Sequence, residues 1–283
     1  MLLGEPMPSQ YDWRFQLFGF PVRVTWLFWL INAALGYGVA MGMDNRLTWF
    51  SKTSQELASP GLASLLVVWV IAAFLSILIH ELGHAIAFRF FGIESQIVLY
   101  HMGGLAIPTA GFVFRRGGQR TRLTHGHQIL ISAAGPFLQL AAALAVAAIA
   151  TVGGMQLPVI TTLANTLGIS PDSLPDLLPS GVFRSPWLYA FVDFFVLIGV
   201  WWPLFNLLPV YPLDGGHITQ HVAAIVRRTD GLHEAHLIGA IAGFAVAWWF
   251  YTSGGSPINA MLFLSLAMSN VQALQQRSGP YGW

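Results

Sequence analysis

Long apolar segments with few or no charged residues are the main pattern along the chain. A segment of about 20 apolar residues is long enough to cross the hydrocarbon core of a bilayer as a helix. Six such segments occur, at 24–43, 62–90, 128–152, 187–208, 235–252 and 258–275. The pattern therefore predicts an all-α polytopic membrane protein with about six transmembrane helices.

Short polar stretches and helix breakers separate these segments. Gly153-Gly154 and Pro158 end the third segment, and the Ser-Gly-Gly-Ser-Pro run at 253–257 divides the last two. Glycine and proline interrupt a regular helix, so each break is expected to be a turn or loop. The predicted layout is a cytoplasmic N-terminal segment at 1–22, one membrane domain at 23–275 and a tail at 276–283.

Composition supports a membrane protein and narrows its partners. Hydrophobic residues make up 55% of the chain and charged residues only 9%, whereas a soluble domain carries about 25% charged residues. The formal net charge of +1 gives no basic field for nucleic acid. Because there is no cysteine, any metal must be bound by His, Asp or Glu. We expect the partners to be lipids and hydrophobic peptides.

Basic residues gather on one side of the predicted helices. Only Arg46, Lys52 and Arg184 fall on the side away from the termini. The others fall on the terminal side, at Arg14, Arg23, Arg89, Arg115, Arg116, Arg120, Arg122, Arg227, Arg228 and Arg277. Since Lys and Arg are enriched in cytoplasmic loops, both termini are predicted to be cytoplasmic. The chain is expected to be a multi-pass protein of the cell (inner) membrane.

The second apolar segment contains the sequence His-Glu-Leu-Gly-His at 80–84. Histidines four residues apart lie on one face of a helix, so His80 and His84 can reach the same metal ion. Glu81 would lie beside that metal, where a carboxylate can take a proton from water. Ionisable side chains are costly inside a membrane helix and indicate a functional site there. The motif predicts a zinc hydrolase.

A catalytic zinc usually takes three protein ligands and leaves a fourth position open. In the predicted topology, Asp214 lies just past the inner end of the fourth segment, at the depth of the two histidines. Asp193 would lie near the outer end of that segment, and Asp172 and Asp176 on the opposite side of the membrane. Asp214 is therefore the predicted third ligand.

Prolines and glycines surround Asp214. Pro203, Pro209 and Pro212 cannot continue a regular helix, and Gly215-Gly216 can adopt conformations that other residues avoid. Irregular backbone at membrane depth is tolerated where it is buried in protein or faces a water-filled cavity. The segment is expected to be partly unwound, which would admit the water that a hydrolase needs.

Together these motifs resemble the site-2 protease family of intramembrane zinc metalloproteases, which pairs a membrane HExxH with a downstream N-x-x-P-x-x-P-L-D-G sequence. Residues 206–215 match the second motif. The resemblance implies that His80, His84 and Asp214 bind one zinc ion per chain, with Glu81 as general base and acid. It also implies that Asn206 hydrogen-bonds the substrate carbonyl. The substrates would be membrane proteins, cleaved within or near their transmembrane segments.

The resemblance extends beyond the two motifs. Residues 18–23 look like the family's entry to helix one, and Gly103-Gly104 like its loop after helix two. In the family this loop forms a membrane-associated β-hairpin that pairs with an extended substrate, and residues 96–100 have suitable β-branched character. Family members commonly have Asn at the position of Gln139. Gly103, Gly104 and Gln139 are accordingly expected to bind substrate.

Several alternatives stay open at this point. His217 and His221 form a second pair four residues apart, which could be a second metal site or could line the cavity. His125 and His127, in an arginine-rich loop, are expected to face lipid headgroups. A membrane di-iron oxygenase, a non-catalytic adaptor that binds membrane helices, and a transporter are rival functions. The substrate and the oligomeric state are not set by the sequence.

Overall fold

The computed structural model describes residues 6–54, 58–101, 103–109, 113–114, 120–121, 123–155, 157, 185–253 and 257–278. Over this part of the chain it contains seven α-helices: α1 (Trp26–Ser54), α2 (Leu62–Phe90), α3 (His125–Val152), α5 (Pro186–Asn206), α6 (Asp214–Arg227), α7 (Leu232–Thr252) and α8 (Pro257–Ser278). Its strands are β1 (Trp13–Leu17), β2 (Phe20–Val24), β3 (Ser95–Tyr100), β4 (Gly103–Pro108), β5 (Val113–Phe114) and β6 (Arg120–Thr121).

Six of the helices are long and apolar enough to cross a membrane, and the exception is α6. The predicted polytopic helical fold is therefore confirmed. One helix differs visibly from its apolar segment, because α1 continues past Asp44 and Arg46 to Ser54. Ser59 donates a hydrogen bond to the Asp44 carboxylate, and Arg46 lies 4.0 Å from the carboxylate of Asp193 on α5. Charged residues such as Asp44 and Arg46 interrupt the apolar segment, but the helix can continue through them because their side chains have polar partners.

The chain divides into two compact units. The first comprises Met1–Ala85, Glu94–Thr109 and Phe137–Trp201, and the second comprises Ile86–Ile93, Ala110–Pro136 and Trp202–Trp283. Each unit has its own apolar core.

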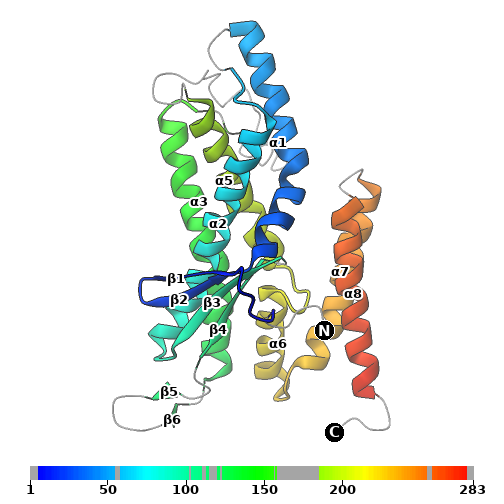
Figure 1. Ribbon diagram of the computed structural model, residues 1–283. Helices are drawn as coiled ribbons and strands as arrows, with labels where there is room; N and C mark the ends of the chain where they lie inside the picture. The colour runs from blue at the N-terminus through cyan, green and yellow to red at the C-terminus, as the bar shows by residue number, and fades with distance from the viewer. Residues whose placement is uncertain are drawn as a thin grey trace. The chain divides into compact units, whose positions relative to one another are not determined.

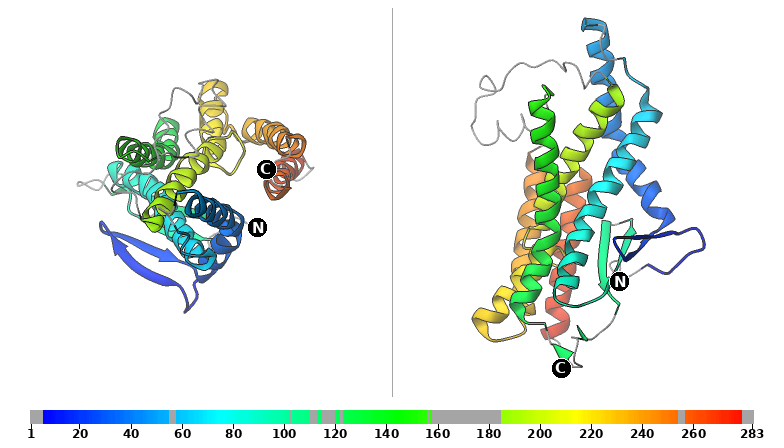
Figure 2. Two further views of the ribbon diagram at one scale, coloured as in Figure 1. Left: turned by 90° about the horizontal axis from the view of Figure 1, so that it is seen from above. Right: turned by 90° about the vertical axis from the view of Figure 1, so that its left-hand side faces the viewer.

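Four helices pack together in the first unit, as Figures 1 and 2 show for α1, α2, α3 and α5. Lipid offers no hydrophobic drive for helix association, so close packing of small residues matters. Ala72, Ala143 and Ala190 are fully buried in this core. A Cβ atom on Gly199 of α5 would lie only 2.6 Å from the Cβ of Ala143, so α3 and α5 require glycine at this crossing.

A four-stranded sheet in the order β1-β2-β3-β4 lies beside the part of α2 that carries Glu81 (Figures 1 and 2). The expected hairpin after helix two is present as antiparallel β3 and β4, and β2 pairs in parallel with β3. Residues 18–23, which look like the family's entry to helix one, form the turn and most of the second strand of a β1–β2 hairpin that precedes α1. Its turn residues Phe18 and Gly19 have positive φ angles of 51° and 80°, as a tight hairpin turn requires.

In the second unit, α7 and α8 form an antiparallel pair (Figure 1) around Phe250, Phe263 and Leu266. Helix α6, which was not predicted, begins at Asp214. Cβ atoms on Gly215 and Gly216 would overlap with the backbone of Leu207 and Tyr211, so these glycines allow α6 to pack tightly on the preceding loop.

Among the basic residues used to predict the orientation in the membrane, the arginines at 115, 116 and 122 lie outside the described residues.

Candidate metal centre

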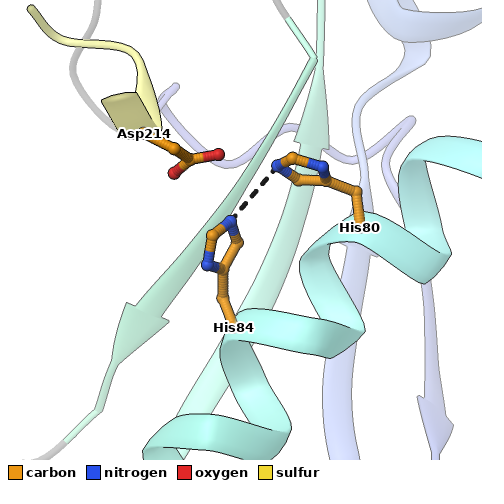
Figure 3. A group of neighbouring side chains, drawn as sticks. All are labelled: His80, His84 and Asp214. Atoms are coloured by element: carbon orange, nitrogen blue, oxygen red, sulfur yellow. Dashed lines mark hydrogen bonds between the residues drawn. The ribbon is translucent and has the colours of Figure 1, made fainter. Parts of the chain in front are cut away.

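The HELGH residues lie on α2, inside a candidate membrane span. His80 and His84 are 3% and 8% exposed, and their Nε2 atoms lie 3.2 Å apart. Figure 3 shows the two imidazoles turned toward each other from successive turns of the helix. The helical spacing alone accounts for this arrangement, because residues four apart share a face.

This spacing fits a shared metal ion. Zinc binds histidine nitrogen at about 2.0–2.1 Å with tetrahedral geometry, which places two such nitrogens about 3.3 Å apart. The observed 3.2 Å separation is close to that value. Neutral imidazole is also a common zinc ligand. The pair is therefore suited to zinc.

The outer nitrogen of His80 contacts α3. His80 Nδ1 lies 2.9 Å from Gln139 Oε1, and Gln139 Nε2 donates to Ser76 Oγ at 2.9 Å. All three side chains are buried, and Gln139 is only 1% exposed. Gln139 was expected to bind substrate, but its described contacts are with His80 and Ser76. Ser76 was missed in the sequence, although its position four residues before His80 places it on the same helix face.

Glu81 is buried between the HELGH helix and the sheet. Its side chain is so close to β4 that a Cβ atom on Gly104 would overlap with its carboxylate, and its residue exposure is 4%. Burial raises the pKa of the neighbouring Tyr100 hydroxyl, and the charge of Glu81 raises it further. Gly104, for which the family resemblance implies substrate binding, thus lies beside the predicted general base. Gly103 is the first residue of β4, with φ of 123°.

Asp214 and Asn206 belong to the second unit. Asp214 is the first residue of α6 and the third side chain drawn in Figure 3. Asn206 is the last residue of α5, and its side-chain Nδ2 donates to the carbonyl of Trp202 at 2.9 Å. Within this unit, the buried Asn270 of α8 donates to the carbonyl of Tyr211 at 2.7 Å, which holds the loop before Asp214.

Four other histidines, His125, His127, His217 and His221, have contacts within the second unit. His125 and His221 face each other with Nδ1 atoms 3.1 Å apart, and His217 lies against the ring of Tyr211. Burial lowers the pKa of His221, and the imidazoles of His125 and His217 lower it further. His127 stacks on Phe91 at a centroid distance of 4.5 Å. A second metal site at His217 and His221 stays a prediction.

The other acidic candidates are differently placed. Asp193 lies on α5 near Arg46 of α1, within the first unit. Asp172 and Asp176 lie outside the described residues. His80 and His84 belong to the first unit and Asp214 to the second, and imidazole and carboxylate are both donor types that zinc binds.

Comparison with known proteins gives the family. The model of peptidase family M50 matches residues 68–250 of the chain, a range that includes both motifs. The chain belongs to peptidase family M50. This is the site-2 protease family that the sequence resembled, and its members are zinc metalloproteases. Together with the six candidate spans, family membership makes the chain an integral, multi-pass membrane protein.

Among solved structures, this M50 chain is similar to the site-2 protease from Methanocaldococcus jannaschii. The two are 19% identical, with 93% of this chain and 95% of the other covered and a TM-score of 0.46. The comparison with curated proteins finds no match. The cytoplasmic location of the termini stays a prediction from the basic residues.

Proposed function

We propose that this M50 member is an intramembrane zinc metalloprotease that hydrolyses peptide bonds within or near transmembrane segments of other membrane proteins. The observation that carries the proposal is the buried pair of His80 and His84, with Nε2 atoms 3.2 Å apart in a candidate membrane span. Glu81 lies between them in sequence and is equally buried. A metal-binding pair next to a carboxylate is the arrangement that metal-assisted hydrolysis requires.

We assign the zinc ligands to His80, His84 and Asp214. Two neutral imidazoles and a carboxylate give the three-ligand set of a catalytic zinc, with one position left for water or substrate. When bound, zinc supplies a Lewis acid that polarises the scissile carbonyl and activates water. The Asn-x-x-Pro-x-x-Pro-Leu-Asp-Gly motif at 206–215 supports Asp214. The rival oxygenase needs about eight histidine ligands, and membership of a peptidase family argues against it.

Glu81 is the proposed proton carrier. Its carboxylate would accept a proton from the attacking water and deliver it to the leaving amine, because a general base in hydrolysis returns its proton as a general acid. Contact with β4 restricts the orientation of its side chain. A general base held in one position loses less conformational freedom at the moment of reaction.

The edge of the sheet is the proposed binding place for substrate. In the described sheet, β4 lies at the end of the strand order, with β3 as its neighbour. An extended peptide can add to such an edge through main-chain hydrogen bonds. The strand passes Glu81 at Gly104, so a peptide on β4 would run close to the proposed base. A helical substrate must unwind first, which favours segments that contain Gly, Pro or Asn. Asn206 would donate to the substrate carbonyl.

Metal removal tests this function. Purified protein in detergent or liposomes is expected to bind one zinc per chain and to cleave a model membrane-protein substrate. Treatment with a strong chelator should abolish cleavage, and added zinc should restore it, because the metal is part of the chemistry. Metal analysis and gel-based cleavage give the two measurements. A chain that binds no zinc, or that cleaves equally well after zinc is removed, would contradict the proposal.

Gly104→Ala is expected to impair cleavage without loss of zinc. The added methyl group would collide with the Glu81 carboxylate, which must then move away from its position. Because misplacement of a reacting group by about 1 Å can cost 100-fold, kcat should fall by roughly 10–100-fold. The matched control is Gly38→Ala on α1, where a Cβ atom meets nothing within 4 Å. If both variants have the same kcat, the contact of Gly104 with Glu81 does not affect catalysis and Gly104 is not part of the active site.

A further inference from the structure

The chain Ser76–Gln139–His80 joins α2 to α3 through two hydrogen bonds of 2.9 Å. The exposures of Ser76, Gln139 and His80 are 0%, 1% and 3%. A polar network this deeply buried is maintained only when its members satisfy one another, since each unpaired group costs free energy. Gln139 therefore has a defined set of partners, one of which is the proposed zinc ligand His80.

The hydrogen bonds of His80 indicate which nitrogen carries the proton when its imidazole is neutral. Its Nε2 faces His84, and its Nδ1 faces Gln139 Oε1. An amide oxygen can only accept, so the proton of neutral His80 resides on Nδ1. The lone pair is then on Nε2, on the side of His84. Ser76 Oγ accepts from Nε2 at the other end of the amide, so both ends of Gln139 have a partner.

We propose that Gln139 is a positioning residue for the metal centre, which holds His80 in the tautomer and ring orientation that binds zinc, and is not a substrate-binding residue. The proposal rests on the proposed zinc function. Outer contacts of this kind commonly orient metal-bound histidines. A neutral amide does so without placing a second negative charge near His80.

The same geometry favours Gln over Asn at this position. Asn is shorter by one methylene, about 1.5 Å of reach. At a contact of 2.9 Å, that loss would leave Asn too far from His80 to form a hydrogen bond unless α2 and α3 moved closer. Gln139→Asn is therefore expected to behave like a loss of the contact in this chain.

Zinc affinity tests the proposal. Gln139→Leu keeps the side-chain size but removes the acceptor, and zinc affinity should fall by about 10–100-fold, as for other outer contacts of metal ligands. Competition with a chromophoric chelator measures this fall in the purified full chain. Gln139→Glu, which keeps an acceptor at the same reach, should retain affinity near the wild-type value. Gln272→Leu, at an exposed glutamine of α8, is the matched control and should bind zinc normally.

A second measurement separates positioning from substrate binding. Nitrogen NMR of labelled histidine should show His80 with its proton on Nδ1 in the wild type, and a mixture of tautomers in Gln139→Leu. Ser76→Ala, a smaller change, should shift the same signal in the same direction and serves if Gln139→Leu fails to fold. Unchanged zinc affinity and tautomer with a raised KM would make Gln139 a substrate residue and overturn the proposal. Absence of zinc from the wild type would instead overturn the proposed function.

Discussion

Glu81→Gln is expected to abolish proteolysis while zinc stays bound. Glutamine has nearly the same size as glutamate, so the packing against β4 at Gly104 is preserved. It cannot accept a proton, however, and a positioned general base contributes about 100–10,000-fold to rate. The expected loss of kcat is therefore at least about 100-fold. Zinc content by metal analysis and cleavage of a membrane substrate should be measured on the same sample.

The control for this variant is Glu94→Gln, which makes the same chemical change at an exposed glutamate before β3. It should cleave at the wild-type rate. Cleavage retained in Glu81→Gln would exclude Glu81 as the general base. Full activity loss accompanied by zinc loss would show that Glu81 supports the metal rather than the proton transfer. The variant also tests the adaptor alternative, because an adaptor would bind its partner without any need for this carboxylate.

Asp214→Ala is expected to remove zinc and activity together. A catalytic zinc with only two histidine ligands loses a third of its protein donors and the only negative charge among them. The fall in zinc affinity should exceed the roughly 10–100-fold that follows loss of an outer contact, so Asp214→Ala should bind more weakly than Gln139→Leu. Chelator competition on both variants gives the comparison directly.

The control for Asp214 is Asp230→Ala, at an exposed aspartate in the turn between α6 and α7. Zinc affinity should be unchanged there, apart from any effect of losing the hydrogen bond to the amide of Leu232. If Asp214→Ala binds zinc as tightly as the wild type, the third ligand must be another residue. His217, three residues further along α6, would then be the first candidate for replacement.

Much of the fold follows from local pattern. The six membrane spans could be predicted because a helix that crosses a bilayer needs about 20 apolar residues, and such segments can be recognised directly in the sequence. The hairpin after helix two was implied by the resemblance to the site-2 protease family, and the β-branched residues there suit it. The β1–β2 hairpin was not expected. Strand β2 pairs with β3 from a distant part of the chain, and the local sequence pattern does not indicate such a long-range pairing. Helix α6 was missed because Asp-Gly-Gly looks like a break, although those glycines allow close packing on the preceding loop.

The candidate site divides in the same way. By itself, the sequence determined that His80 and His84 share a helix face and that Glu81 accompanies them, since helical periodicity is a local property. Predicted membrane depth, together with the resemblance to the family motif, also singled out Asp214 as a ligand. Only the tertiary structure decided that Gly104 lies against Glu81 and that Gln139, expected to bind substrate, contacts His80. These contacts join residues far apart in the chain, and the packing of whole helices and strands determines which side chains meet.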